Sequence, residues 1–334
     1  MTTEQRHIRF LLAACGVLAL LYAASFVLNR RTAPKMATLA LLNEKYLADI
    51  AVVRAVPPKT PLPGTAHPPE PTALEVRRAD SLWTCVSGAL RAPAAPGFID
   101  SLLKKAAAAR KLYLVSEKPS AFDALSLADG NAFRLDFLSA SGDVRSSLYF
   151  GAPDFTGRLV SVRSASSPKS YQTQNDFLPW LVGDLTHWSD ESLVPKASGI
   201  LDDSDIQSAT LFRATVPGQT ASPPPAVRLT NNAEAFHALA SLRNVAVREA
   251  GTDGAREPAA ALRVEGGNGS IVDISLLPVS ETASGGAAIG AYIAVPKIAC
   301  GPAFSPADKA AAEAFSYALE ISSWTYSRIM ELFE

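Results

Sequence analysis

The stretch FRLDFLSASGDVRSSLYFG, residues 133–151, gives the strongest indication of the fold. Leu135 and Phe137 alternate with polar residues, and successive side chains of a strand point to opposite faces of a sheet. The SASGD stretch supplies turn residues, after which Leu148 and Phe150 continue the alternation. We therefore expect an antiparallel hairpin at the centre of a sheet.

A second copy of this pattern follows in the other half of the chain. ALRVEGGNGSIVDISLL, residues 261–277, alternates in the same way around a GGNG turn. DIQSATLFRATVPG, which begins at residue 205, parallels DIAVVRAVPP, which begins at residue 49, and a helix over 233–245 corresponds to a helix that begins at Phe98. The fold class we expect is therefore α+β, with two related units of mainly antiparallel sheet and helices packed on one face.

An uncharged apolar stretch, FLLAACGVLALLYAASFVL, occupies residues 10–28. As a helix it would be roughly 28 Å long, which is close to the thickness of the hydrocarbon core of a bilayer. We interpret it as an uncleaved transmembrane helix; a cleaved signal peptide is the alternative, although no small-residue cleavage site closes the stretch before Arg30. The residues expected to form the membrane anchor include Phe10, Leu11, Leu12, Val17, Leu18, Leu20, Leu21, Phe26, Val27 and Leu28.

This anchor organises the predicted layout of the chain. Basic residues flank it on both sides in similar number, so local charge does not set its orientation. Because a long domain can be translocated largely regardless of its own charges, we expect a single-pass protein of the cytoplasmic membrane with an extracytoplasmic, periplasmic body. The parts are an N-terminal tail (1–9), the anchor (10–28), a juxtamembrane segment (29–48), a first unit (49–197) and a second unit (198–334).

Composition and motifs argue against several functions. The formal net charge of -1 and the pI near 6.5 provide no basic surface for nucleic acid. Cys15 lies in the anchor, which leaves Cys85 and Cys300 either to pair in an oxidising compartment or to be small buried apolar residues. The 4 histidines are scattered, and there is neither a Gly-x-Ser-x-Gly motif nor a phosphate-binding loop. We expect no enzymatic activity, no metal and no cofactor.

Two acidic groups look like connecting segments in the sequence. Asp202, Asp203 and Asp205 lack the spaced oxygen ligands of a calcium loop, and we interpret them as a linker between the units. Asp190 and Glu191 are interpreted as a solvated turn, since adjacency alone does not identify paired catalytic carboxylates.

Two groups of apolar residues are candidates for an interaction surface. Trp180 and Trp188 lie in an aromatic cluster that can hold a sugar ring or pack one unit against the other. From Ser305 onwards, a capping serine, Pro306 at the first helical position and apolar residues three and four apart predict a long helix. This helix can pack on its own sheet or offer an apolar face to a partner. Its candidate residues are Phe315, Leu319, Tyr326, Met330 and Phe333.

Several stretches of the first half resemble a known family. These are LLNEKYLADIAVVRAV, RKLYLVS, FRLDFLSASGDVRSSLYFGAPDFTGRLVSVR and YQTQNDFLPWLVGDLTHWSDESLVP. Together with the anchor they look like the membrane-anchored bacterial proteins that carry domain of unknown function 4340, over about residues 40–195. The resemblance implies an extracytoplasmic domain, often encoded beside an ABC-type export permease and a gliding-motility-type auxiliary protein. It implies no known enzyme activity.

These observations lead to two functional hypotheses. The first is a non-enzymatic accessory or scaffold component of an ABC-type transport assembly in the cell envelope. Its partners would be the lipid bilayer, the permease and the auxiliary protein, and not nucleic acid. The alternative is an extracytoplasmic ligand-binding module, for instance for a glycan, that uses the aromatic rings around Trp180 and Trp188.

Overall fold

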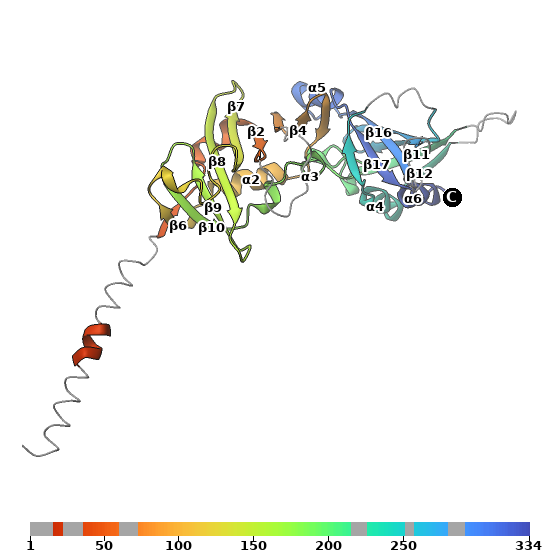
Figure 1. Cartoon of the computed structure of the whole chain (residues 1–334). Coiled ribbons are helices and arrows are strands. Elements are labelled where there is room, and N and C mark those ends of the chain that lie inside the picture. The colour runs from red at the N-terminus through yellow and green to blue at the C-terminus, as the bar shows by residue number, and fades with distance from the viewer. Residues whose placement is uncertain (1–15, 23–35, 60–72, 215–225, 251–256, 280–290) are drawn as a thin grey trace, which may run out of the picture.

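The computed structural model describes residues 16–22, 36–59, 73–214, 226–250, 257–279 and 291–334 (Figure 1). Over these residues the chain is built mainly of antiparallel strands, which form a ten-stranded and a seven-stranded sheet with a few short helices. The expected α+β class with an N-terminal transmembrane helix is therefore wrong. The helices are too short and too few to form a layer comparable with the sheets.

The first sheet comes from the N-terminal half of the described chain. Each of its strands pairs antiparallel with its neighbours. The predicted hairpin of residues 133–151 is confirmed as β7 and β8, close to the middle of this sheet. In order across the sheet, the strands are β1 (Met36–Leu39), β6 (Arg110–Ser116), β10 (Ser170–Gln174), β9 (Leu159–Ser164), β8 (Val144–Pro153), β7 (Phe133–Ser139), β2 (Ile50–Val56), β3 (Leu74–Ala79), β4 (Leu82–Ser87) and β5 (Leu90–Pro93).

The second sheet comes from the C-terminal half and is also antiparallel throughout. In order across the sheet, its strands are β12 (Val227–Thr230), β11 (Ile206–Arg213), β14 (Ala260–Gly266), β15 (Ile271–Pro278), β16 (Ala291–Ala299), β17 (Ala318–Ser322) and β13 (Ala246–Arg248).

The two sheets share one strand order. The run β3-β2-β7-β8-β9-β10-β6 of the first sheet corresponds position by position to β12-β11-β14-β15-β16-β17-β13 of the second. Helix α2 (Phe98–Ala107) and helix α4 (Ala233–Ser241) precede corresponding strands. The pairing register also shifts at equivalent places, between Ile50 and Val52 in the first unit and between Ile206 and Ser208 in the second. A bulge at the same position in both sheets indicates that the two units are copies of one fold.

The apolar stretch at the N-terminus falls mostly outside the described residues. Residues 16–22 are helical, whereas Phe10, Leu11, Leu12, Phe26, Val27 and Leu28 are not described. Val17, Leu18, Leu20 and Leu21 each expose more than half of their surface. Within the described ranges, no helix combines the length and apolar character needed to cross a membrane. Part of the predicted juxtamembrane segment, Met36–Leu39, is strand β1 at the edge of the first sheet.

The long helix predicted from Ser305 is wrong. The chain forms α5 (Pro306–Glu313), returns to the sheet as β17 and ends in α6 (Ser323–Glu331). Tyr317, Leu319 and Ile321 are buried at alternate positions, as in a strand. Helical and strand spacing coincide at Phe315 and Leu319, so the apolar pattern does not distinguish the two conformations.

A strand hairpin shared by both cores joins the two units. Strands β4 and β5 extend the first sheet and lie between the units in Figure 1. Trp83 and Cys85 on one face pack into the core of the first unit. Leu82 on the other face packs into the core of the second unit, and so does Leu90, which pairs with Ser87 at the turn of the hairpin. The hairpin therefore contributes buried residues to the cores of both units.

One buried carboxylate bonds across this junction, and a second organises the segment that connects the units. Asp308 of α5 accepts hydrogen bonds from Ser81 N (3.1 Å), Leu82 N (2.9 Å) and Ser81 Oγ (2.8 Å) at the start of β4. Asp190 accepts from the backbone N–H groups of Ser192 and Lys196, and it is 3% exposed. The interpretation of Asp190 as part of a solvated turn is therefore wrong, because its carboxylate is sequestered to organise the connecting segment.

Candidate functional site

A groove beside helix α2 in the first unit is a concave site within the described residues. It has a volume of about 980 Å³ and lies between the chain that leads into β2, the C-terminal end of α2 and the outer ends of β8 and β9. Apolar and polar groups contribute to its walls in similar measure. Its lining residues are Ala40, Leu41, Asn43, Glu44, Tyr46, Leu47, Lys104, Ala107, Ala108, Ala109, Arg145, Ser146, Ser164 and Ser166.

The first wall of the groove is fixed by backbone hydrogen bonds. Leu41 N and Leu42 N both donate to Ala106 O of α2, at 3.0 and 2.9 Å. Leu42 is fully buried and anchors this stretch in the core of the first unit. The side chain of Asn43 then accepts from Lys45 N (3.1 Å) and begins the short helix η1 (Glu44–Asp49). This cap places the half-buried ring of Tyr46 at the rim.

The floor of the groove is polar. Ser146 comes from β8, and Ser164 and Ser166 come from the end of β9 and the residues after it. The hydroxyls of Ser164 and Ser166 lie 3.0 Å apart, within hydrogen-bonding distance. Each serine hydroxyl has both a donor and acceptor positions, so the floor can bind either type of polar group.

Two cations border this floor with different surroundings. Arg145 is paired with the carboxylate of Asp49 at the bulged start of β2. Lys104 is exposed on the last turn of α2 and makes no ion pair with any residue in the described ranges. Glu44 is the acidic residue of the lining. The charge available to an incoming group is therefore the ammonium of Lys104.

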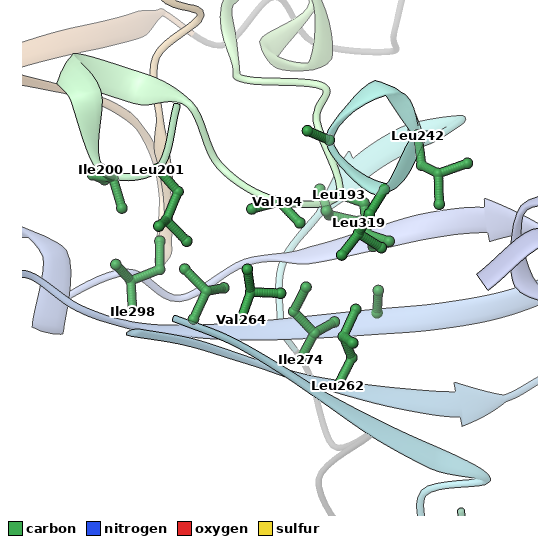
Figure 2. Packing of buried hydrophobic residues seen from close by; sticks show 14 of the residues in the cluster. Leu193, Val194, Ile200, Leu201, Leu242, Leu262, Val264, Ile274, Ile298 and Leu319 are labelled. Atoms are coloured by element: carbon green, nitrogen blue, oxygen red, sulfur yellow. The ribbon is translucent and has the colours of Figure 1, made fainter. Parts of the chain in front are cut away.

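In the second unit the chain itself occupies the corresponding place. Leu193 N donates to Leu242 O beside α4 (3.0 Å), as Leu41 N does to Ala106 O beside α2. From that hydrogen bond to the first strand the second unit has four more residues than the first. Figure 2 shows two residues of this longer connecting segment, Ile200 and Leu201, packed over Ile298.

The strand register identifies what differs beneath this segment. Ser146 of the first unit corresponds to Val272 of the second, because both lie two strands from the equivalent bulged strands β2 and β11. By the same register, Ser164 of the first unit corresponds to Pro296 of the second, and Ser166 corresponds to Ile298. Val272 and Ile298 are buried. Serines have thus replaced the apolar floor in the unit that leaves its groove open.

A glycine confirms that the second unit is fitted to its own segment. A Cβ atom added to Gly266 would clash with Leu201 Cδ2, so any larger residue would displace this leucine. Asn268 completes the fit, since its side-chain amide donates to Gly199 O (3.1 Å) and Ile200 O (3.0 Å). The second unit is therefore closed at the position where the first is open.

The aromatic cluster predicted as an interaction surface is buried in the first unit. Trp180 is 6% exposed and Trp188 is fully buried. Both rings pack on Phe98, with centroid separations of 5.6 and 5.4 Å. Their indole N–H groups donate to Phe98 O and Val182 O. Neither ring offers a face to a sugar, so the glycan hypothesis loses the residues on which it depended.

The C-terminal candidates also belong to a core. Leu319 and Phe333 are buried, and Phe315, Tyr326 and Met330 are half-buried against the core of the second unit. Tyr326 stacks on Tyr292 with a centroid separation of 3.8 Å. These residues close the second unit and do not form the face of one helix.

The other titratable groups have structural surroundings. Cys85 and Cys300 do not form a disulfide, and burial raises the pKa of the Cys85 thiol to about 12. Asp203, in the predicted linker, pairs with Lys196 and His237. In the described part of the chain, no group of histidine, cysteine and acidic residues has an arrangement that could hold a metal ion.

The groove residues were missed by sequence reasoning. The sequence patterns single out none of Lys104, Ser146 and Ser164 as a candidate site residue. The signal available was the repeat itself, because aligning the two hairpins places Ser146 against Val272. Where one copy has a polar residue at a position that is apolar and buried in the other copy, the polar position faces solvent or a ligand instead of a core.

Comparison with known proteins finds no matching family model, no matching curated protein and no matching solved structure. The resemblance to proteins that carry domain of unknown function 4340 therefore stays a prediction.

Proposed function

We propose that this chain is a non-catalytic accessory subunit that holds a partner protein in the groove of its first unit. The observation that supports this proposal is the difference between the two copies. The second unit fills the space beside α4 with its own residues 194–201, whereas the first leaves about 980 Å³ beside α2. A preformed groove of this size, in which apolar and polar groups converge, has the character of a binding site.

The partner we propose is a component of an ABC-type transport assembly of the cell envelope. This choice comes from the family resemblance of the first half and not from the geometry of the groove. The resemblance covers the segment from about residue 40 to 195, which contains every residue of the groove lining. A permease or its auxiliary protein would then occupy the groove, while the second unit supports the first through the shared hairpin.

Site-specific photo-crosslinking in the native cells tests this proposal. A photoreactive phenylalanine analogue at Leu47, on the groove wall, should capture a defined partner that mass spectrometry identifies as a transport component. The matched control is the same analogue at Lys297, an exposed position on β16 of the second unit. Equal adducts at both positions, or none at Leu47, would contradict the proposal.

A further inference from the structure

We infer that the groove beside α2 binds an extended, acidic peptide segment of its partner. This inference rests on the proposed function and adds the chemistry of the bound segment. It is drawn from three features: the segment that fills the corresponding place in the second unit, the serine floor and the cation at the end of α2.

The second unit shows which shape fits this place. Residues 194–201 cross the end of the sheet as a connecting segment with little regular structure, apart from the short helix η4 (Ala197–Gly199). Its peptide carbonyls at Gly199 and Ile200 accept hydrogen bonds from a side chain of the β14–β15 turn. The layer between helix and sheet is thus built to receive a single peptide strand. In the first unit the corresponding connecting segment is four residues shorter and leaves part of this layer open.

The serine floor determines the polarity of the occupant. Ile200 and Leu201 pack over an apolar floor in the second unit, where Val272 and Ile298 are buried. In the first unit the hydroxyls of Ser146 and Ser166 take these two positions, and Ser164 lies at the position of Pro296. The hydroxyls of Ser164 and Ser166 can bond each other, but an apolar plug would leave the Ser146 hydroxyl and the free hydrogen of the serine pair without acceptors, at a cost of about 1–3 kcal/mol for each donor that became buried. Peptide carbonyls or side-chain carboxylates would accept hydrogen bonds from them.

The charge at the rim selects an acidic occupant. Lys104 has no ion pair within the described residues, whereas the guanidinium of Arg145 is already paired with Asp49. A carboxylate on the bound segment would pair with Lys104 and receive hydrogen bonds from nearby serines. Glu44 lies on the opposite wall, so an acidic side chain is favoured on the α2 side of the groove only.

The apolar wall adds one further requirement. Leu41, Leu47 and the ring of Tyr46 line the side formed by the entering chain, and Ala107 and Ala108 line the α2 side. These residues can contact one apolar side chain of the occupant. The recognised segment therefore has an acidic residue close to an apolar one in an extended conformation, a mode in which alternate side chains point to opposite sides.

Selection of phage-displayed random peptides of about twelve residues tests the inference. The full-length chain is immobilised and compared with two variants. Ser146→Val with Ser166→Ile introduces the floor residues that the second unit carries, and Lys104→Glu reverses the charge at an exposed position that leaves the core intact. Circular dichroism establishes that each variant is folded.

We expect peptides enriched in aspartate or glutamate beside an apolar residue on the wild type. Lys104→Glu should weaken their binding by about tenfold or more, and the double variant should abolish their enrichment. Enrichment of basic or uncharged peptides, equal binding to Lys104→Glu, or no enrichment over the empty surface would each overturn the inference. A specific crosslink at Leu47 combined with any of these results would leave the proposed function standing with an occupant of different chemistry.

Discussion

Removal of the Asp308 carboxylate should uncouple the two units. In Asp308→Ala, the N–H of Leu82 loses its acceptor at a fully buried position, and the N–H and hydroxyl of Ser81 lose theirs at an exposed position. A buried donor left without a partner costs about 1–3 kcal/mol, whereas water can replace most of what Ser81 loses. With the loss of an acidic group in the first turn of α5, worth about 0.3–1 kcal/mol, we expect a destabilisation of about 3 kcal/mol.

Urea unfolding followed by tryptophan fluorescence and by circular dichroism measures this change. Trp83, Trp180 and Trp188 lie in the core of the first unit, so fluorescence reports mainly on that unit, and circular dichroism reports on the whole chain. The two curves should separate in Asp308→Ala. Asp308→Asn keeps one acceptor oxygen and should lose about half as much.

The control is Asp273→Ala, which removes a half-exposed ion pair with Arg263 and should cost less than about 1 kcal/mol. If Asp308→Ala is no more destabilising than this control, the carboxylate does not hold the junction and the reasoning fails.

Three further predictions concern other parts of the molecule. Because burial raises the pKa of Asp190, the folded chain binds a proton there more readily than the unfolded chain does. The free energy of unfolding of the wild type, relative to that of Asp190→Asn, should therefore increase as the pH falls from about 7 to about 4. A difference between the two proteins that stays constant with pH in urea titrations would contradict this prediction. Cys85 is fully buried and has a pKa of about 12, so it should react with a thiol reagent only on global unfolding. Mass spectrometry of samples labelled under increasing urea measures this reaction. Labelling of Cys85 before Cys300 would show that Cys85 is not protected by the core. Phe155 is fully exposed at the β8–β9 turn, so Phe155→Ser should change the free energy of unfolding by less than about 0.5 kcal/mol. Trp188 is fully buried, so Trp188→Ala should lower the free energy of unfolding by about 3–5 kcal/mol. Equal thermal midpoints of the two variants would show that the burial of Trp188 contributes nothing.

The strands of the first hairpin could be predicted because their local signals agree. Leu135 and Phe137 alternate with polar residues, and a turn with Gly142 at a positive φ of 89° follows. The same reasoning applied to residues 305–334 failed, because Phe315 and Leu319 fit a strand and a helix equally well. The pairing of Leu319 with Ala294 of β16 decides between them, and this tertiary contact is not expressed in the local pattern.

The groove could not be predicted from residue types. Ser146 and Lys104 are ordinary surface residues in their own segments, and they come together only because α2 lies across the ends of β8 and β9. Trp180 and Trp188 misled for the opposite reason. Aromatic residues dominate both cores and binding sites, and only the burial of these rings separates the two uses.

The shared hairpin has a consequence for how this molecule can change over time. Duplicated units in many chains are separable modules, which can be lost, multiplied or exchanged by recombination at the linker. Here a break at residue 198 would strip Leu82 and Leu90 of the apolar surface that covers them and would open both interiors to water. The two units are therefore expected to be inherited together, because the core of the second unit needs the hairpin of the first. The second copy can be retained for the support it gives to β4 and β5, while the serine floor of the first copy can change without disturbing that support.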